Sequence, residues 1–299
     1  MPRIETLDLG FQGTPETIAS FLVVGPAGPV LLETGPGSTL PRLVEQLEER
    51  GFVPKDVQGV LVTHIHLDHA GGAGWWAQQG IPVYVHSAGA PHLIDPSKLL
   101  ASAERIYGDR MEPLWGQTLP APRENIIPVE DGDAIEVAGL RFRALSTPGH
   151  ARHHHVYRLE DIGFMGDALG ILLPGRQWID LPAPPPEFDL EAWRESVQRI
   201  RQQEFSTIYR THFGEVGDVA EQIDSFEKIL IEGANLVRQM MAEGLERSSM
   251  VNRYQSQMRD RATAAGLDQA TANAYELVTP RDMSVDGIAR YWRKKDRQH

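Results

Sequence analysis

The chain has 299 residues, a length that allows one large domain or a domain with an appendage. Its 41% hydrophobic and 23% charged residues are ordinary for a globular protein, and a chain of this size buries a core without disulfides. It has no cysteine, which excludes a thiolate nucleophile and a metal site built on sulfur. The net charge of −12 resides in the first part, since residues 219–299 carry 12 basic and 12 acidic residues. This distribution disfavours nucleic acid as a partner.

Nothing in the sequence predicts a membrane association. No run of about 18 apolar residues is present, and the first residues lack the charged and then apolar pattern of a signal peptide. We therefore expect a cytoplasmic protein.

Short apolar runs separated by glycine and proline fill the first two thirds of the chain and predict β-strands. These runs are residues 18–24, 30–33, 57–63, 82–85, 134–137, 140–145, 155–159 and 162–165. Helical spacing at 41–50, 70–79 and 189–203 separates them. Strands interleaved with helices indicate an α/β fold whose sheets are covered by helices.

Residues 87–125 contain few strand signals and one helical stretch, at 96–111. An irregular insertion of this size is either a lid over a site or a surface helical hairpin, and the sequence favours neither. Within it, Tyr107 and Trp115 are candidate apolar walls for a substrate.

From Val219 onward the apolar residues follow a spacing of three and four, which predicts helices. Further helical patterns cover 250–265, 269–278 and 284–296. We expect a first domain over residues 1–218 and an all-helical extension over residues 219–299. The extension offers a surface for a homodimer, although the sequence does not set the stoichiometry.

The strongest chemical signal is residues 57–72, VQGVLVTHIHLDHAGG. His64 and His66 follow an apolar strand, and side chains two positions apart in an extended chain point the same way. Asp68 and His69 then open the next helix. Three imidazoles and a carboxylate within six residues at a strand-to-helix turn predict a metal site.

This HxHxDH segment resembles the signature of the metallo-β-lactamase superfamily. Further segments resemble its other motifs in the expected order, and the resemblance covers about residues 4–215. They are LETGPG at 32–37, STPGH at 146–150, FMGDA at 164–168 and THFG at 211–214. Two departures from the pattern stand out. Glu33 replaces an aspartate, and threonine and phenylalanine flank His212 where PGHG is commoner.

The resemblance implies an αββα sandwich of two mixed β-sheets flanked by helices, holding two divalent metal ions. It implies that Asp167 bridges the ions and that Asp68 and Asp167 are the catalytic carboxylates. Imidazole and carboxylate ligands suit zinc, which we expect, and also manganese or iron. The implied ligands of the first ion are His64, His66 and His150, and those of the second are Asp68, His69 and His212.

Three more residues are candidates for supporting the ligands or contacting a substrate. His154 stands where many relatives carry a further histidine, and Glu33 occupies the position of the family aspartate. Asp180 follows a predicted strand and is a candidate for lining the site. We interpret His153 and His155 as surface residues rather than as substrate contacts.

A bridging aspartate resembles the glyoxalase II, lactonase and phosphodiesterase branches of the superfamily rather than its β-lactamases. We therefore expect a dinuclear hydrolase whose metal-bridging hydroxide attacks an activated carbonyl of a small molecule, such as a thioester, lactone or ester. Two enzymatic alternatives stay open, a phosphodiesterase or ribonuclease and a mononuclear iron enzyme resembling persulfide dioxygenases. A metal-stabilised binding module without catalysis is the remaining hypothesis.

Overall fold

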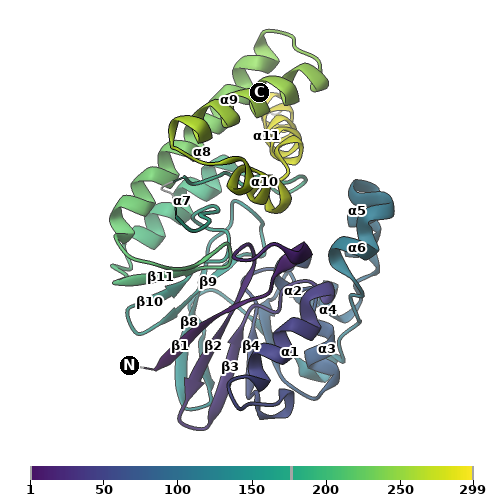
Figure 1. Cartoon of the computed structure of the whole chain (residues 1–299), viewed down its shortest axis with the longest axis vertical. Coiled ribbons are helices and arrows are strands. Elements are labelled where there is room, and N and C mark those ends of the chain that lie inside the picture. The colour runs from purple at the N-terminus through teal and green to yellow at the C-terminus, as the bar shows by residue number, and fades with distance from the viewer. Residues whose placement is uncertain (1, 176–177, 298–299) are drawn as a thin grey trace.

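The computed structural model describes residues 2–175 and 178–297. Two six-stranded β-sheets pack face to face, and helices cover the outer face of each sheet (Figure 1). A set of helices follows the sandwich at the C-terminal end of the chain. The αββα sandwich with a helical extension is thereby confirmed.

The first sheet has the order β1-β2-β3-β4-β5-β6. Its first three strands are antiparallel, whereas β3 to β6 run parallel and are joined by crossovers that contain helices. The strands are β1 (Arg3–Asp8), β2 (Ala19–Gly25), β3 (Gly28–Leu32), β4 (Gly59–Leu61), β5 (Val83–His86) and β6 (Ile126–Val129).

The second sheet has the order β12-β11-β10-β9-β8-β7. It is antiparallel except between β10 and β11, which α7 (Leu190–Arg201) connects. Its strands are β7 (Ala134–Val137), β8 (Leu140–Ser146), β9 (His155–Leu159), β10 (Ile162–Phe164), β11 (Thr207–Arg210) and β12 (Gly214–Val216).

Three apolar clusters hold these layers together. One fills the space between the sheets and includes Phe21, Phe142 and Phe164. A second packs helices onto the first sheet around the fully buried Trp76. The third packs α7 and the extension onto the second sheet around Trp193. The helices on the first sheet are α1 (Leu40–Glu48), α2 (Leu67–Ala70), α3 (Ala73–Gln78), α4 (Ala90–Ile94), α5 (Ser97–Tyr107) and α6 (Met111–Trp115).

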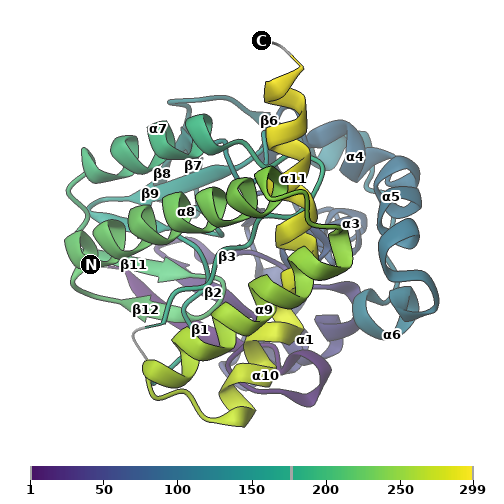
Figure 2. The same cartoon turned by 90° about the horizontal axis from the view of Figure 1, so that it is seen from above.

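The extension shares its core with the sandwich. The ring of Phe226 lies 5.3 Å from that of Trp193, and both are fully buried. The hydroxyl of Tyr275 donates to the carbonyl of Trp178 and accepts from the amide of Leu173. Figure 2 shows these helices crossing the middle of the molecule, with α4 to α6 along one side. They are α8 (Val219–Ala242), α9 (Arg247–Ala264), α10 (Gln269–Val278) and α11 (Arg281–Asp296).

The structure differs from the sequence prediction mainly in four strands that were not expected: β1, β6, β11 and β12. Three of them lie at sheet edges, where alternating exposure or a proline weakens the apolar pattern. The helix expected at 70–79 is two helices, α2 and α3, separated by Gly71 and Gly72. A Cβ at Gly71 would lie 2.9 Å from the Cα of Pro36, so the chain needs glycine there.

None of the described helices is both long and apolar enough to cross a bilayer.

Candidate metal centre

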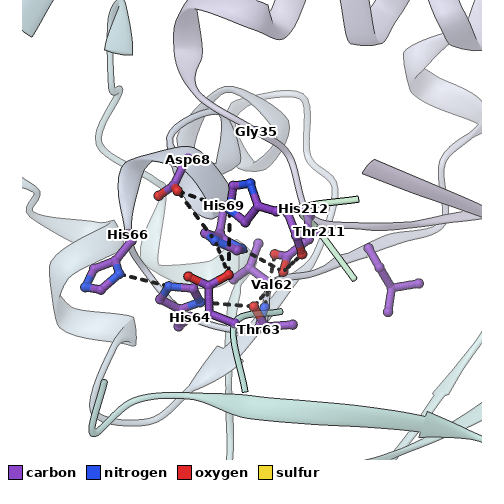
Figure 3. A network of polar contacts seen from close by, with 12 residues as sticks. Gly35, Val62, Thr63, His64, His66, Asp68, His69, Thr211 and His212 are labelled. Atoms are coloured by element: carbon purple, nitrogen blue, oxygen red, sulfur yellow. Dashed lines mark hydrogen bonds and ion pairs between the residues drawn. The ribbon is translucent and has the colours of Figure 1, made fainter. Parts of the chain in front are cut away.

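All seven predicted ligands lie at one end of the sandwich, in turns that follow strands. His64 and His66 come just after β4, and Asp68 and His69 belong to the short helix α2 that follows (Figure 3). His150, Asp167 and His212 follow β8, β10 and β11, respectively. Because the strands end at the same edge, the fold gathers residues that are far apart in the sequence.

Three imidazole nitrogens meet in the first ligand set, which consists of His64, His66 and His150. The Nδ1 of His66 lies 2.9 Å from the Nε2 of His64 and 2.9 Å from the Nε2 of His150. The Nδ1 of His150 donates to the carbonyl of Pro182 at 2.8 Å. In the neutral ring the Nε2 then carries a lone pair that can bind a metal ion. Burial and the neighbouring imidazoles lower the pKa of His66 to about 3. The set therefore presents neutral imidazoles, the form that binds metal.

The second ligand set consists of Asp68, His69 and His212. The Oδ2 of Asp68 lies 3.4 Å from the Nε2 of His212 and 3.7 Å from the Nε2 of His69. The Nδ1 of His212 donates to the carbonyl of Thr17 at 2.7 Å. Burial raises the pKa of Asp68, but His69 and His212 outweigh it and hold the value at about 2. This carboxylate is therefore ionised at neutral pH.

Asp167 lies between the two sets. Its Oδ1 is 3.3 Å from the Nε2 of His69 and 3.6 Å from the Nε2 of His212, whereas its Oδ2 is 3.4 Å from the Nε2 of His150. Burial opposes ionisation, yet His69 and His150 hold the pKa of Asp167 well below its usual range. The two carboxylate oxygens thus face different ligand sets.

The donor atoms fit divalent metal ions. The ligand atoms of each of three overlapping groups lie within 4.8 Å of one another. Among the described residues, the Nε2 atoms of His69 and His212 and the Oδ1 of Asp167 are buried without a hydrogen-bond partner. Buried polar atoms are normally paired, and converging lone pairs repel unless a cation lies between them. The three groups are His64, His66 and His150; His64, His69 and Asp167; and Asp68, His69 and His212.

Glu33 orients one ligand from behind. Its Oε1 lies 3.1 Å from the Nδ1 of His69 and accepts from the hydroxyls of Thr63 at 2.5 Å and Thr211 at 3.2 Å. Its Oε2 accepts from the amide of Thr63 at 3.2 Å. With φ at 66°, the Glu33 backbone is in the left-handed region. The longer side chain thus takes up the supporting position expected at this turn.

His154 holds the backbone of Asp167. Its Nε2 accepts from the Asp167 amide at 3.2 Å, and its Nδ1 lies 2.8 Å from the hydroxyl of Thr147. The preceding Gly166 has φ at +51°, and a Cβ there would lie 2.4 Å from the hydroxyl of Thr63. Glycine is required before Asp167 for both reasons.

A cleft of about 600 Å³ opens above the ligands. His66, Asp68, His150 and Asp167 belong to its lining. One wall comes from α5 and α6, and the other from residues 182–187 and from residues 276–284 at the junction of α10 and α11 (Figure 1). Tyr107 and Trp115, the candidate apolar walls for a substrate, are both among the residues that line the cleft.

Asp180 and two histidines lie elsewhere than expected. Asp180 is buried outside the cleft lining, accepts from the amide of Leu181 and lies 3.8 Å from Arg281 of the extension. The interpretation of His153 and His155 as surface residues is wrong, because both are buried. His153 lines the cleft, and the ring of His155 stacks on that of His86 at 4.4 Å.

Two further polar residues near the predicted ligands, Glu187 and Arg210, were not singled out from the sequence. Glu187 lies in the cleft, with its Oε2 3.1 Å from the Nε2 of His153. Arg210 is fully buried and donates to the carbonyls of Leu169 and Gly170, just after Asp167. Arg210 sits two positions before His212, which is the only local signal that could have singled it out. Glu187 follows a run of prolines and has no such signal.

Comparison with known proteins places these features in a family. The profile of the Metallo-beta-lactamase superfamily matches residues 13–212. A metallo-beta-lactamase fold-containing protein of Sulfurisphaera tokodaii is 28% identical over 189 residues, covering 62% of this chain and 68% of that protein. A hydroxyacylglutathione hydrolase of Xylella fastidiosa is 28% identical over 149 residues, covering 49% of this chain. The match spans only 43% of that hydrolase.

Solved structures show the same fold over nearly the whole chain. An archaeal metallo-beta-lactamase superfamily protein from Sulfolobus tokodaii aligns with a TM-score of 0.69 at 19% identity, covering 97% of this chain and 99% of that one. A metallo-beta-lactamase family protein from Thermus thermophilus aligns with a TM-score of 0.68 at 21% identity, covering 98% and 94%. The helical extension is therefore included in the structural match.

Proposed function

Since the chain belongs to the metallo-beta-lactamase superfamily, whose members are generally metal-dependent hydrolases, we propose that it is a dinuclear hydrolase of an activated carbonyl compound. The substrate class is a thioester, lactone or ester. The observation that carries this proposal is the position of Asp167, whose two oxygens face separate ligand sets. We further propose zinc as the resident metal, because imidazole and carboxylate ligands without sulfur suit it.

The metals, when bound, would supply a water of lowered pKa as nucleophile and a Lewis acid for the carbonyl oxygen. The chain itself holds the ligands in position. Glu33 fixes the ring of His69, His154 fixes the backbone of Asp167, and the carbonyl of Pro182 fixes the ring of His150. Against the effect of burial, His69 and His212 hold the pKa of Asp68 at about 2, so its carboxylate is ionised at neutral pH and can accept a hydrogen bond or a proton.

The cleft walls favour a carbonyl substrate over a nucleic acid. They present apolar side chains from the insertion and the extension, and their three basic residues, Lys98, Arg110 and Arg152, are matched in number by three carboxylates, Glu187, Glu276 and Asp282. A phosphodiester backbone calls for a continuous basic groove, which these walls do not provide. The resemblance to a hydroxyacylglutathione hydrolase agrees with a carbonyl substrate.

Elemental analysis of the purified protein by mass spectrometry is the first test. About two zinc ions per chain, with turnover of a thioester or lactone chromogen and none of bis-p-nitrophenyl phosphate, would support the proposal. About one iron per chain with oxygen uptake would contradict it and favour the mononuclear oxygenase. Turnover of the phosphodiester alone would favour the second alternative, and tight metal binding without any turnover would favour a binding module.

A further inference from the structure

Three basic side chains of the cleft lining lie near one another, since, besides burial, Lys98 and Arg152 both lower the pKa of His92, and the proposed hydrolysis does not use them. His92 from α4, Lys98 from α5 and Arg152 from the turn after His150 all line the cleft. They come from three separate segments, and we call this group the cationic end. Although the chain has a net charge of −12, this basic cluster beside the metal centre would attract an anionic ligand.

Only one carboxylate of the cleft lining balances this cluster. Glu187 lies 3.0 Å from the Nε of Arg152 and 3.1 Å from the Nε2 of His153. Burial raises the pKa of Glu187, but His153 and the other bases hold it at about 2, so it is ionised. Lys98 forms no ion pair with any described residue. Burial and the neighbouring cations lower the pKa of His92, so within the cationic end Lys98 and Arg152 against Glu187 leave one positive charge unbalanced. Arg110, which follows the other end of α5, is a further cation of the cleft lining, and its guanidinium lies over the ring of Tyr107.

Apart from the predicted ligands Asp68 and Asp167, the remaining acidic residues of the cleft are Glu276 and Asp282 at the junction of α10 and α11, and both are already paired. Glu276 lies 3.2 Å from Arg281, and Asp282 lies 3.4 Å from Arg247. These carboxylates therefore do not satisfy Lys98.

An apolar strip leads along α5 from the cationic end. Leu99, Ala103 and Ile106 recur at helical spacing, and all three line the cleft. Ile106 is 39% exposed, one of the few large apolar side chains with that much exposure among the described residues. Leu99 is half-buried and Ala103 is buried, so Ile106 is the exposed part of the strip. A large apolar side chain exposed inside a cleft is typical of a surface that a ligand covers.

We propose that the substrate is an acyl compound whose chain ends in a carboxylate, bound with its scissile carbonyl at the metal centre and its carboxylate at the cationic end. The apolar strip covers the methylene groups between the two. A single negative charge matches the one positive charge that is left unbalanced at the cationic end. This inference rests on the proposed function for the carbonyl end only, because binding of the carboxylate end can be measured without turnover.

Two esters of equal chain length provide the test. Mono-p-nitrophenyl adipate ends in a carboxylate, and p-nitrophenyl hexanoate ends in a methyl group. For the metal-loaded wild-type protein we expect kcat/KM for the adipate to exceed that for the hexanoate by about fivefold, as one partly exposed ion pair contributes. The preference shrinks as salt is added, because exposed charges are screened.

Lys98→Glu and Arg105→Glu form a matched pair of variants. Both residues lie on α5 and are exposed, and only Lys98 lines the cleft. We expect Lys98→Glu to abolish or reverse the preference for the adipate and Arg105→Glu to retain it, although both change the net charge equally. An equal preference in both variants, or none in the wild-type protein, would overturn the proposal.

Calorimetric binding of adipic acid monoanilide and hexananilide separates this proposal from the proposed function. If the wild-type protein binds the anionic anilide more tightly and Lys98→Glu removes the difference, the cationic end stands even where neither ester is hydrolysed. In that case the hydrolase proposal fails alone. If both esters are hydrolysed equally and the anilides bind equally, the carboxylate proposal fails and the hydrolase proposal stands.

Discussion

The predicted metal ligands, which form the floor of the cleft, differ in burial and hydrogen bonding from the side chains of its walls. Of these seven ligands, five are buried, and His66 and Asp68 are half-buried. His69, His150 and His212 each have their second ring nitrogen held by a carboxylate or a backbone carbonyl. On the walls, Lys98 and Ile106 are exposed and make few polar contacts. Under the proposals above, the fixed side chains of the floor would set the chemistry and the exposed side chains of the walls would select the substrate.

The largest effect should come from Asp167→Asn, which tests the floor directly. The amide removes the charge that faces both ligand sets, so we expect metal content to fall below two per chain and kcat/KM to fall at least about 100-fold. Mass spectrometry and turnover are measured on the same preparation. Asp260→Asn, an exposed position on α9, is the control. Retention of both metals and full turnover in Asp167→Asn would rule out the bridging position.

Glu33→Gln should weaken the second ligand set and spare the first. The neutral amide loses the charged acceptor for the Nδ1 of His69, and changes at such supporting positions typically cost about 10–100-fold in metal affinity. Titration with a chelator should therefore remove one metal at lower chelator concentration than in the wild-type protein. Glu48→Gln, exposed on α1, is the control. Simultaneous loss of both metals would show that the two sets are not independent.

Phe226→Ala tests whether the helical extension, which carries one wall of the cleft, unfolds together with the sandwich. The side chain is fully buried against Trp193, and its loss should cost about 3–5 kcal/mol of unfolding free energy. Because α8 and the second sheet share one core, we expect a single unfolding transition at lower denaturant concentration, with two metals still bound. Val53→Ala, at a 38% exposed position, should change little. Two separate transitions would instead mark the extension as an independent unit.

The sequence alone singled out the residues of the floor because each predicted ligand lies within a few residues after a strand. HIHLDH, TPGH, GDA and THFG each carry their ligands within a few residues, and the strand ends bring them together. The apolar runs likewise predicted the central strands, such as β3 and β10. The edge strands β1 and β6 were not predicted, since a half-exposed strand needs fewer apolar residues.

The walls could not be predicted because they depend on packing between distant segments. His153 and Glu187 meet across 34 positions of chain, and Asp180 meets Arg281 across 101. No local pattern distinguishes a histidine that is buried by such packing from one that is exposed. The same reason explains why Asp180, although close in sequence to the ligand-supporting Pro182, faces the extension rather than the cleft.

The smallest effect should be the loss of stability in acid that His155 causes. The His155 amide donates to the carbonyl of Thr63, the residue before the predicted ligand His64, at 2.7 Å. Burial and the neighbouring His86 lower the pKa of His155 from 6.5 to about 3. Because the folded state favours the neutral ring, its contribution to stability is present above pH 6.5 and is lost as the pH falls toward 3. At pH 5 the loss is about 2 kcal/mol.

His155→Gln removes this titration and should therefore flatten the pH dependence of stability. Denaturant unfolding at pH 7.5 and pH 5 measures it, with the wild-type protein losing about 2 kcal/mol more than the variant between the two values. Acid also protonates the metal ligands, but that loss is common to both proteins and cancels in the difference. If the difference in unfolding free energy between the wild-type protein and His155→Gln is the same at both pH values, burial does not hold His155 neutral. The desolvated region around the ligands would then not include His155.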